Sequence, residues 1–302
     1  MKKNTRPTAA AASVLQRLAV LLAAGVPPPS AWGYLGQNDF TEAVAISSAG
    51  IAVPEAIVGA LDRLAPSEAT AWRGVAAAWD VATDAGAPLA STLRHFADSL
   101  RDLTEAERQV RIALAAPVAT ARLVMALPAV GVLFGMALGF DTVRTLFATV
   151  PGWICLAAGA ALLYGGWRWN RGLLRSARPR DITPGLEFDL IAIAVTGGGS
   201  LDWARSSVAA SIARFSPNVA VDWPAVDDVL ELSTRAGVPA AELLRSEAIE
   251  RRRTARASAQ ERAQQLSVRL MIPLGVCVLP AFMVLGVLPL LISVLSSSAV
   301  KL

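Results

Sequence analysis

Few side chains in this chain of 302 residues could carry covalent chemistry. The sequence holds one histidine, His95, and two cysteines, Cys155 and Cys277. His95 stands among charged residues on a helix-patterned segment, which indicates a solvated side chain. Both cysteines lie in apolar runs, where a thiol behaves as a small hydrophobic group. Metal and nucleophile sites need several such groups at short spacing. We therefore expect no enzyme, no metal site and no cofactor.

Other polar patterns are equally poor in chemistry. The glycines Gly197 to Gly199 are not followed by Lys-Ser or Lys-Thr, as a phosphate-binding loop requires, so we interpret them as a flexible helix end. Two acidic clusters have helical spacing, and pairing with arginines explains them more simply than docking to a basic partner does. These clusters are Asp227, Asp228 and Glu231, and Glu105 and Glu107.

The composition predicts an all-α membrane protein with substantial soluble parts. Hydrophobic residues make up 54% of the chain and charged residues 17%, and the mean hydropathy is +0.48. No alternating run bounded by turn residues suggests a strand. The net charge of +4 could indicate a nucleic-acid partner. Because the bases cluster beside apolar segments, membrane topology explains them better, and we expect no nucleic-acid binding.

Three apolar segments are long enough to cross a bilayer of about 30 Å. They run from Leu123 to Phe140, from Val150 to Trp169 and from Leu270 to Val294. The alternative, a helical hairpin buried in a soluble protein, leaves the aromatic residues at the ends of the second segment unexplained. Interfacial belts of membrane helices carry such residues. They are Trp153, Tyr164, Trp167 and Trp169.

The predicted spans hold no ionisable residue at depth, which argues against an ion-coupled transporter. Small residues instead recur four apart in the first two spans, a spacing that lets helices approach closely. We expect these residues to pack helices within the protein or between copies, although incidental richness in glycine and alanine also explains them. They are Gly131, Gly135, Gly139, Ala157, Ala161 and Gly165.

The N-terminal segment superficially resembles a signal peptide. Arg17 and Gln16 interrupt its apolar run, so we favour an amphipathic helix from Ser13 to Ala24 over a cleaved signal. Farther on, residues 67–85 predict a helix with Trp72, Val75, Trp79 and Val81 inward. The helix after Pro88 predicts an apolar stripe of Leu89, Leu93, Phe96, Leu100 and Leu103.

An internal repeat organises the soluble parts. Gly86-Ala-Pro88 matches Gly237-Val-Pro239 at an offset of 151 residues (237 − 86), and Trp72 and Trp223 match at the same offset. Gly25 matches Gly198 at a larger offset of 173 residues (198 − 25). The difference between the two offsets predicts an insertion of 22 residues (173 − 151) in the first copy, within residues 37–66. Each copy therefore predicts two helical hairpins with glycine turns. The turn residues are Gly25, Gly86, Pro88, Gly198, Gly237 and Pro239.

These features predict two duplicated cytoplasmic helical-bundle domains and three transmembrane helices. Residues 1–121 form the first bundle, 122–170 a transmembrane hairpin, 171–268 the second bundle, and 269–302 the third span with a short external tail. Arginines follow the hairpin at Arg168, Arg171 and Arg175 and precede it at Arg122. By the positive-inside rule both ends of the hairpin are cytoplasmic, as is the N-terminus, and the C-terminus is external.

The layout, the repeated Gly-x-Pro hairpins and the spans resemble a known family. Two stretches carry most of the likeness: APVATARLVMALPAVGVLFGMALG and AQERAQQLSVRLMIPLGVCVLPAFMVLGVLPLL. They are similar to the F-type inner-membrane platform proteins of type II secretion and type IV pilus systems, and most similar to the Tad/Flp pilus branch. Members of that branch often carry one cytoplasmic F domain and come as two distinct proteins, whereas this chain holds two halves.

The resemblance implies a platform without enzymatic activity. It would bind a cytoplasmic secretion ATPase, couple it to the assembly of pilin-like subunits, and associate with copies of itself or with a sister platform protein. We expect basic helix faces to contact the ATPase, at Arg94, Arg101, Arg245, Arg251, Arg252 and Arg253. A small transporter or channel subunit is the alternative, and it predicts a polar face through the spans.

Overall fold

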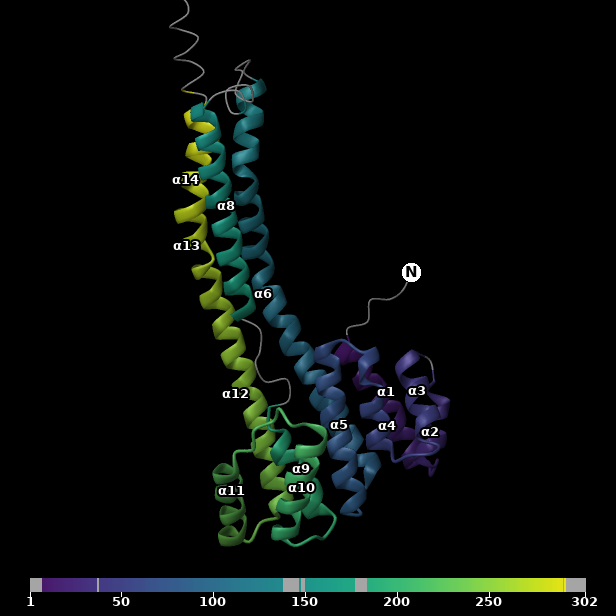
Figure 1. Cartoon of the computed structure of the whole chain (residues 1–302). Helices are drawn as coiled ribbons and strands as arrows, with labels where there is room; N and C mark the ends of the chain where they lie inside the picture. The colour runs from purple at the N-terminus through teal and green to yellow at the C-terminus, as the bar shows by residue number, and fades with distance from the viewer. Residues whose placement is uncertain are drawn as a thin grey trace, which may run out of the picture. The chain divides into compact units, whose positions relative to one another are not determined.

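The computed structural model describes residues 7–36, 38–137, 147, 150–176, 184–289 and 291. Every regular element within these ranges is helical, as the composition predicts (Figure 1). Contacts divide the chain into two compact units. Unit 1 comprises Met1–Glu107 and Arg180–Ala257, and unit 2 comprises Arg108–Pro179 and Ser258–Leu302. Both segments expected to form separate bundles thus contribute to unit 1.

Unit 1 begins with short helices whose ends follow the local sequence. Prolines stand in the first turns of α2, α4 and α5, where a missing N–H costs nothing. Asn38 caps α3 through a hydrogen bond from the backbone N–H of Thr41, at 2.9 Å. The elements in order are α1 (Pro7–Ala23), α2 (Pro28–Tyr34), α3 (Asp39–Ser47), α4 (Val53–Gly59), the 3₁₀ turn η1 (Leu61–Arg63) and α5 (Pro66–Asp84).

Five more helices contribute to unit 1. The long helix α6 (Leu89–Ala137) contributes its first part, and α12 (Ala240–Arg269) does the same. Between them in sequence lie α9 (Leu186–Thr196), α10 (Leu201–Phe215) and α11 (Trp223–Ala236). Ser200 caps α10, and Asp222 caps α11.

Aromatic side chains fill the centre of unit 1. Trp32 and Trp72 are fully buried, with ring centroids 5.9 Å apart, and Phe40 packs against Trp72 at 4.7 Å. The predicted inward residues of α5 are all buried, which confirms that pattern. The α6 stripe is confirmed as well, since Leu93, for example, is fully buried in this core.

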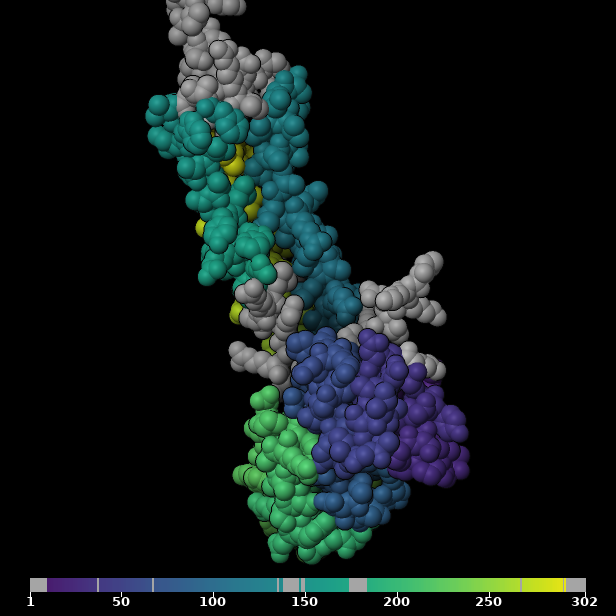
Figure 2. Space-filling view, turned by 45° about the vertical axis from the view of Figure 1, so that its right-hand side comes forward, coloured from purple at the N-terminus to yellow at the C-terminus, as the bar shows by residue number. Residues whose placement is uncertain are grey.

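Helix α5 packs against neighbours from both halves of the sequence. It contacts α1 and α4 on one side and α9 and α10 on the other. Figure 2 shows the early segments in blue and purple meeting the later green segments along one continuous surface of unit 1. Residues 37–66, expected as an insertion, belong to this core, because Val44 and Ile57 are fully buried there.

Among the residues that the structure describes, five glycines adopt left-handed backbone conformations, and four of them end helices at the predicted turns. Gly25 and Gly198 have φ angles of 83° and 90°, and Gly86 and Gly237 both have φ angles of 66°. Only glycine enters this region at little cost, so these positions fix the hairpins. The fifth, Gly185, precedes α9 with φ 76°.

Unit 2 contains the apolar parts of three helices. Three helical stretches are long and apolar enough to span a membrane: Leu89–Phe134, Val150–Leu173 and Ala240–Val287. They include the second part of α6, helix α8 (Val150–Ser176) and the continuation of α12. The predicted ends of the first and third spans, 138–140 and most of 290–294, lie outside the described residues.

The third apolar stretch changes helical type along its length. After α13 (Met271–Pro273) comes a π-helical segment, η2 (Leu274–Val278), then α14 (Leu279–Phe282) and a second π-helical segment, η3 (Met283–Val287). Pro273 and Pro280 remove backbone donors here, and a wider helical turn is one way to accommodate that loss. In contrast, α6 continues through Pro117 and Pro128 without interruption.

Glycines on α6 and α8 receive side chains of the third stretch. A Cβ atom at Gly131 would lie 2.8 Å from the Phe282 ring, and one at Gly159 would lie 2.3 Å from Leu285 Cγ. Figure 2 shows yellow atoms of this stretch between the two teal segments of unit 2. The three helices in unit 2 therefore approach closely because Gly131 and Gly159 have no side chains.

The remaining small residues of the predicted packing stripes are not all at helix–helix contacts. Ala157 and Ala161 are exposed on α8, and a Cβ atom at Gly165 would meet nothing within 4 Å. The buried face of α8 carries Cys155, Gly159 and other residues instead. Gly139 lies outside the described residues, and Gly135 lies in α6. The exposed stripe on α8 stays a prediction for contacts with other chains.

Candidate partner-binding surface on α6 and α12

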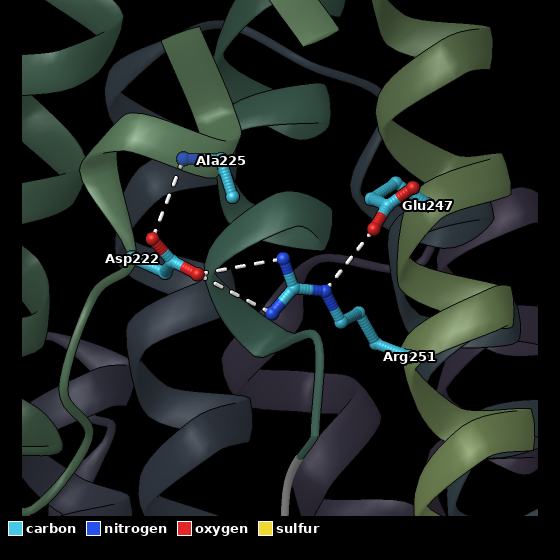
Figure 3. Close-up of polar contacts among 4 residues, drawn as sticks. All are labelled: Asp222, Ala225, Glu247 and Arg251. Carbon is cyan, nitrogen blue, oxygen red and sulfur yellow. Dashed lines mark hydrogen bonds and ion pairs between the residues drawn. The ribbon is translucent and has the colours of Figure 1, made fainter. Parts of the chain in front are cut away.

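Arg251, one of the predicted contact residues, is used inside unit 1. Its guanidinium donates to Asp222 Oδ2 at 3.4 Å through both terminal nitrogens, and its Nε donates to Glu247 Oε1 at 3.1 Å (Figure 3). Asp222 Oδ1 also accepts a hydrogen bond from the N–H of Ala225 at 3.3 Å. Arg251 therefore joins α12 to the capped start of α11.

Arg252 is likewise turned inward. Its Nη1 lies 2.7 Å from Asp189 Oδ2, and the two side chains are only 14% and 17% exposed. Burial raises the pKa of the Asp189 carboxyl, and the neighbouring Arg252 opposes that rise. This pair ties α9 to α12, so a charge reversal at Arg251 or Arg252 would disturb the fold before it tested a partner.

The other predicted arginines are more accessible. Arg253 has a side chain 77% exposed and only a distant pairing with Glu250, at 3.7 Å. Arg94 is exposed on α6, and Arg101 pairs with Asp98 at 2.6 Å, as the spacing predicts. Arg245 donates to Thr196 Oγ1 at 3.2 Å. Arg94 and Arg253 are therefore the basic side chains best placed for a partner.

A groove of about 200 Å³ lies between α6, α9 and α12 of unit 1. Its floor is partly apolar, and Ile249 within it is 52% exposed. The acids of its walls lie on α6 and α9 and the arginines on α12, which suits polar contacts with a peptide segment. The residues that line it are Thr92, His95, Phe96, Asp98, Ser99, Asp102, Asp189, Ile193, Arg245, Ile249 and Arg252.

The groove offers binding rather than bond chemistry. Within the described part of the chain, no group of three metal-ligating side chains is close enough to hold an ion. His95, the one histidine, is exposed on the groove wall, as the charged pattern predicts. Neither cysteine lines the groove, because Cys155 and Cys277 both belong to unit 2.

Sequence reasoning missed the acids that organise this region. Glu187 and Asp189 lie in α9, which is otherwise almost wholly buried, and burial raises the pKa of the Glu187 carboxyl too. Two acids within the apolar run from Leu186 to Thr196 were the available signal, because buried carboxylates usually have a cationic partner. The spacing could not show which arginine is the partner of Asp189, because Arg252 lies 63 residues away in the sequence.

Comparison with known proteins bears on the fold just described. Residues 9–137 match the family model of the type II secretion system (T2SS), protein F. This segment is therefore an F domain of that family. No curated protein and no solved structure matches the chain. The matched F domain covers α1 to α6, so it runs from the core of unit 1 into the first apolar stretch.

The match and the three apolar helices identify a membrane protein of the platform type found in type II secretion and type IV pilus machines. Proteins of this family are membrane platforms and not enzymes. The matched segment spans residues 37–66, which include α3, α4 and η1.

Proposed function

We propose that the chain is the inner-membrane platform of a Tad/Flp-type pilus machine and couples a cytoplasmic secretion ATPase to the assembly of pilin-like subunits. The observation that carries this proposal is the course of α6. Within the matched F domain, α6 begins at Leu89, buries Leu93 in the core of unit 1, and continues without a break through Gly131 in an apolar stretch. Such a helix offers a direct mechanical link between a water-soluble partner and the bilayer.

The internal repeat supports a platform built from two related halves. The φ angles of the paired turns agree closely, at 66° for both Gly86 and Gly237. Gln109 and Gln260, which are 151 residues apart, hydrogen-bond to each other. That separation equals the repeat offset, so equivalent positions of the two halves meet, as they would on a pseudo-two-fold axis. This chain would then supply both halves that the Tad branch often divides between sister proteins.

Two further parts of the proposal concern the membrane. The excess of arginine at the end of unit 2 where α8 finishes supports a cytoplasmic location for that end, with an external C-terminus. The exposed small residues Ala157, Ala161 and Gly165 would face pilin helices or a second platform chain. A transporter is less well supported, because the described apolar stretches carry no ionisable side chain at depth.

The ATPase surface can be tested with a closely matched pair of arginines. Arg253 and Arg235 both have side chains 77% exposed, and both lie 3.7 Å from one glutamate on the same helix. Arg253 lies on α12 with the groove residues, whereas Arg235 ends α11. The double change Arg94→Glu and Arg253→Glu should lower recovery of the ATPase in a pull-down at least fivefold, and more at low salt.

The control Arg235→Glu should leave recovery unchanged. Equal recovery for all variants would remove Arg94 and Arg253 from the interface. If Arg235→Glu lowered recovery as much as the double change at Arg94 and Arg253, overall charge, and not this surface, would attract the ATPase. The proposal that the chain acts in a pilus machine has a separate test, which is loss of surface fibres when the gene is deleted and their return on complementation.

A further inference from the structure

Unit 2 is strongly basic at one end. Its two sequence segments, 108–179 and 258–302, contain only two acids, Asp141 and Glu261. In the sequence Asp141 lies between the first two apolar stretches, whereas most of the arginines gather near the end of α8 and the entry of α12 into the unit. That end therefore carries an excess of positive charge.

Packing contacts place arginines from two helices at the same depth. Gly131 of α6 contacts Phe282, and Gly159 of α8 contacts Leu285, one helical turn away. Arg122 lies nine residues before Gly131, and Arg168 lies nine residues after Gly159. At 1.5 Å per residue, both are about 14 Å along their helices from this contact, toward the basic end.

An open groove lies along α8 at this depth, with a volume of about 480 Å³. Gly165 and Gly172, two turns apart, leave its floor open, and a Cβ atom at either would meet nothing within 4 Å. The described residues that line it are Gly165, Arg168, Trp169, Gly172 and Leu173. The Arg168 cation and the Trp169 indole thus border a shallow hollow on one face of α8, with glycines on its floor.

The cations here are unpaired or held by aromatic rings. Among the described residues Arg168 has no ion pair. The Arg171 guanidinium lies 5.1 Å from the centroid of the Trp167 ring, and Trp167 lies 5.9 Å from Tyr164. Tyrosine and tryptophan side chains of membrane helices are enriched at the headgroup level of the bilayer. The groove lies at the end of an apolar stretch that finishes at Leu173, and this position matches the headgroup level at which lipid phosphates are found.

We propose that this α8 groove binds the headgroup of an anionic phospholipid, with Arg168 contacting the phosphate and Trp169 covering the glycerol region. An arginine donates two parallel hydrogen bonds to a phosphate, which a zwitterionic lipid would also accept. The surplus of cations at the same depth favours the lipid with net negative charge. Gly165 and Gly172 leave room for the upper part of one acyl chain beside the helix.

The test uses the full chain purified in detergent, with bound lipid counted by native mass spectrometry as phosphatidylglycerol is added. Arg168→Gln should weaken binding about fivefold, from the usual contribution of one basic residue near an anionic surface. Gly172→Leu should weaken it at least as much, because the new side chain fills the floor without changing the charge. Circular dichroism and gel filtration establish that each variant is folded, and Arg168→Lys should restore part of the binding.

Matched controls separate this groove from general attraction. Arg262→Gln removes an exposed charge of the same unit outside the groove, and Ala161→Leu adds bulk on the exposed face of α8 above it; both should bind like the wild type. The α8 groove would not be the binding site if Arg262→Gln weakened lipid binding as much as Arg168→Gln does, or if Gly172→Leu left binding unchanged. Equal binding of phosphatidylcholine, or displacement of the lipid by inorganic phosphate at millimolar concentration, would overturn the assignment to an anionic lipid.

Discussion

At the level of single residues, ion pairs divide the arginines of α12 into two classes. Arg251 and Arg252 hold α11 and α9 against α12 from inside unit 1, whereas Arg253 points outward. Neighbouring residues of one basic run thus serve different purposes, because successive side chains on a helix point about 100° apart. Stability and partner binding can therefore be altered separately within three residues.

Removal of Arg252 should destabilise unit 1 severely. Arg252→Met leaves Asp189 buried without its cation, and we expect a loss of about 3 kcal/mol in the free energy of unfolding. Chemical denaturation of the purified chain, followed by circular dichroism, measures this. Arg253→Met is the control and should change stability by less than about 0.5 kcal/mol. Similar losses for the two variants would contradict the role given to the pair with Asp189.

The Glu187 carboxyl should give stability a distinctive pH dependence. Burial raises the pKa of Glu187 above its ordinary value of 4.5, so the folded state binds the proton more tightly than the unfolded state. The free energy of unfolding should therefore fall as pH rises from about 4.5 through the raised pKa. Glu187→Gln should flatten this slope, measured by urea unfolding at a series of pH values. An unchanged slope would mean that other carboxyls set it.

Gly197 illustrates close approach at a helix end. A Cβ atom there would lie 2.0 Å from the carbonyl oxygen of Ala85, so Gly197→Ala forces α9 and α5 apart. We expect a loss of about 2 kcal/mol, measured by thermal unfolding of the full chain. Gly59→Ala is the matched control, because its Cβ would meet nothing within 4 Å, and it should be neutral or slightly stabilising. The reverse order would contradict this packing.

At the level of elements, α6 and α12 pair along a small seam within unit 2. Val110 and Leu114 of α6 pack against Ala259 and Ala263 of α12. The hydrogen bond between Gln109 and Gln260 lies beside this seam and links the two helices. A polar pair in an apolar seam fixes the register of two helices, because any slip leaves both amides unpaired.

A cysteine pair tests that register directly. With Cys155 and Cys277 replaced by alanine, the variant Gln109→Cys/Gln260→Cys should form an intramolecular crosslink under mild oxidation or with a short bismaleimide. Peptide mass spectrometry identifies the link. The control pairs Gln109→Cys with Gln264→Cys, an exposed position one turn farther along α12, and should crosslink poorly. More efficient linkage through residue 264 would show a different register.

The helices themselves could be predicted well from the sequence, because proline and glycine mark their ends and apolar spacing marks their faces. The burial of Trp72 and the left-handed Gly86 followed from such local signals. What could not be predicted was which helices meet. The contacts of α5 with α9 and α10 join segments more than 100 residues apart, and no local pattern encodes them.

The three glycines at the end of α9 have structural roles that the sequence pattern did not indicate. Gly197 to Gly199 suggested a flexible helix end, yet Gly197 abuts Ala85, Gly198 has a φ of 90°, and a Cβ atom at Gly199 would lie 2.3 Å from the Trp203 ring. Of the candidate contact residues, spacing could not distinguish Arg252 from Arg253, because the acid that turns Arg252 inward, Asp189, belongs to another helix.

At the level of the whole molecule, the proposed function requires one topology. The proposal requires the apolar parts of α6, α8 and the stretch after α12 to cross the membrane once each, which puts the two ends of the chain on opposite faces. Reporter fusions should place residue 175 and the N-terminus in the cytoplasm and residues 141 and 302 outside. An external reporter signal from the fusion at residue 175 would leave the F domain out of reach of any cytoplasmic ATPase.

The two π-helical segments of the third apolar stretch have a consequence for its side chains. Each wide turn takes up more residues than an α-helical turn of the same height, and this sets the angle at which later side chains leave the axis. A deletion within Leu274–Val278 can be absorbed when the wide turn closes to an α-helical one, whereas deleting Ala281 from the α-helical turn would rotate Phe282 by about 100°. Phe282 would then no longer pack against Gly131, so this stretch should tolerate many apolar exchanges but few changes in the length of its α-helical turns.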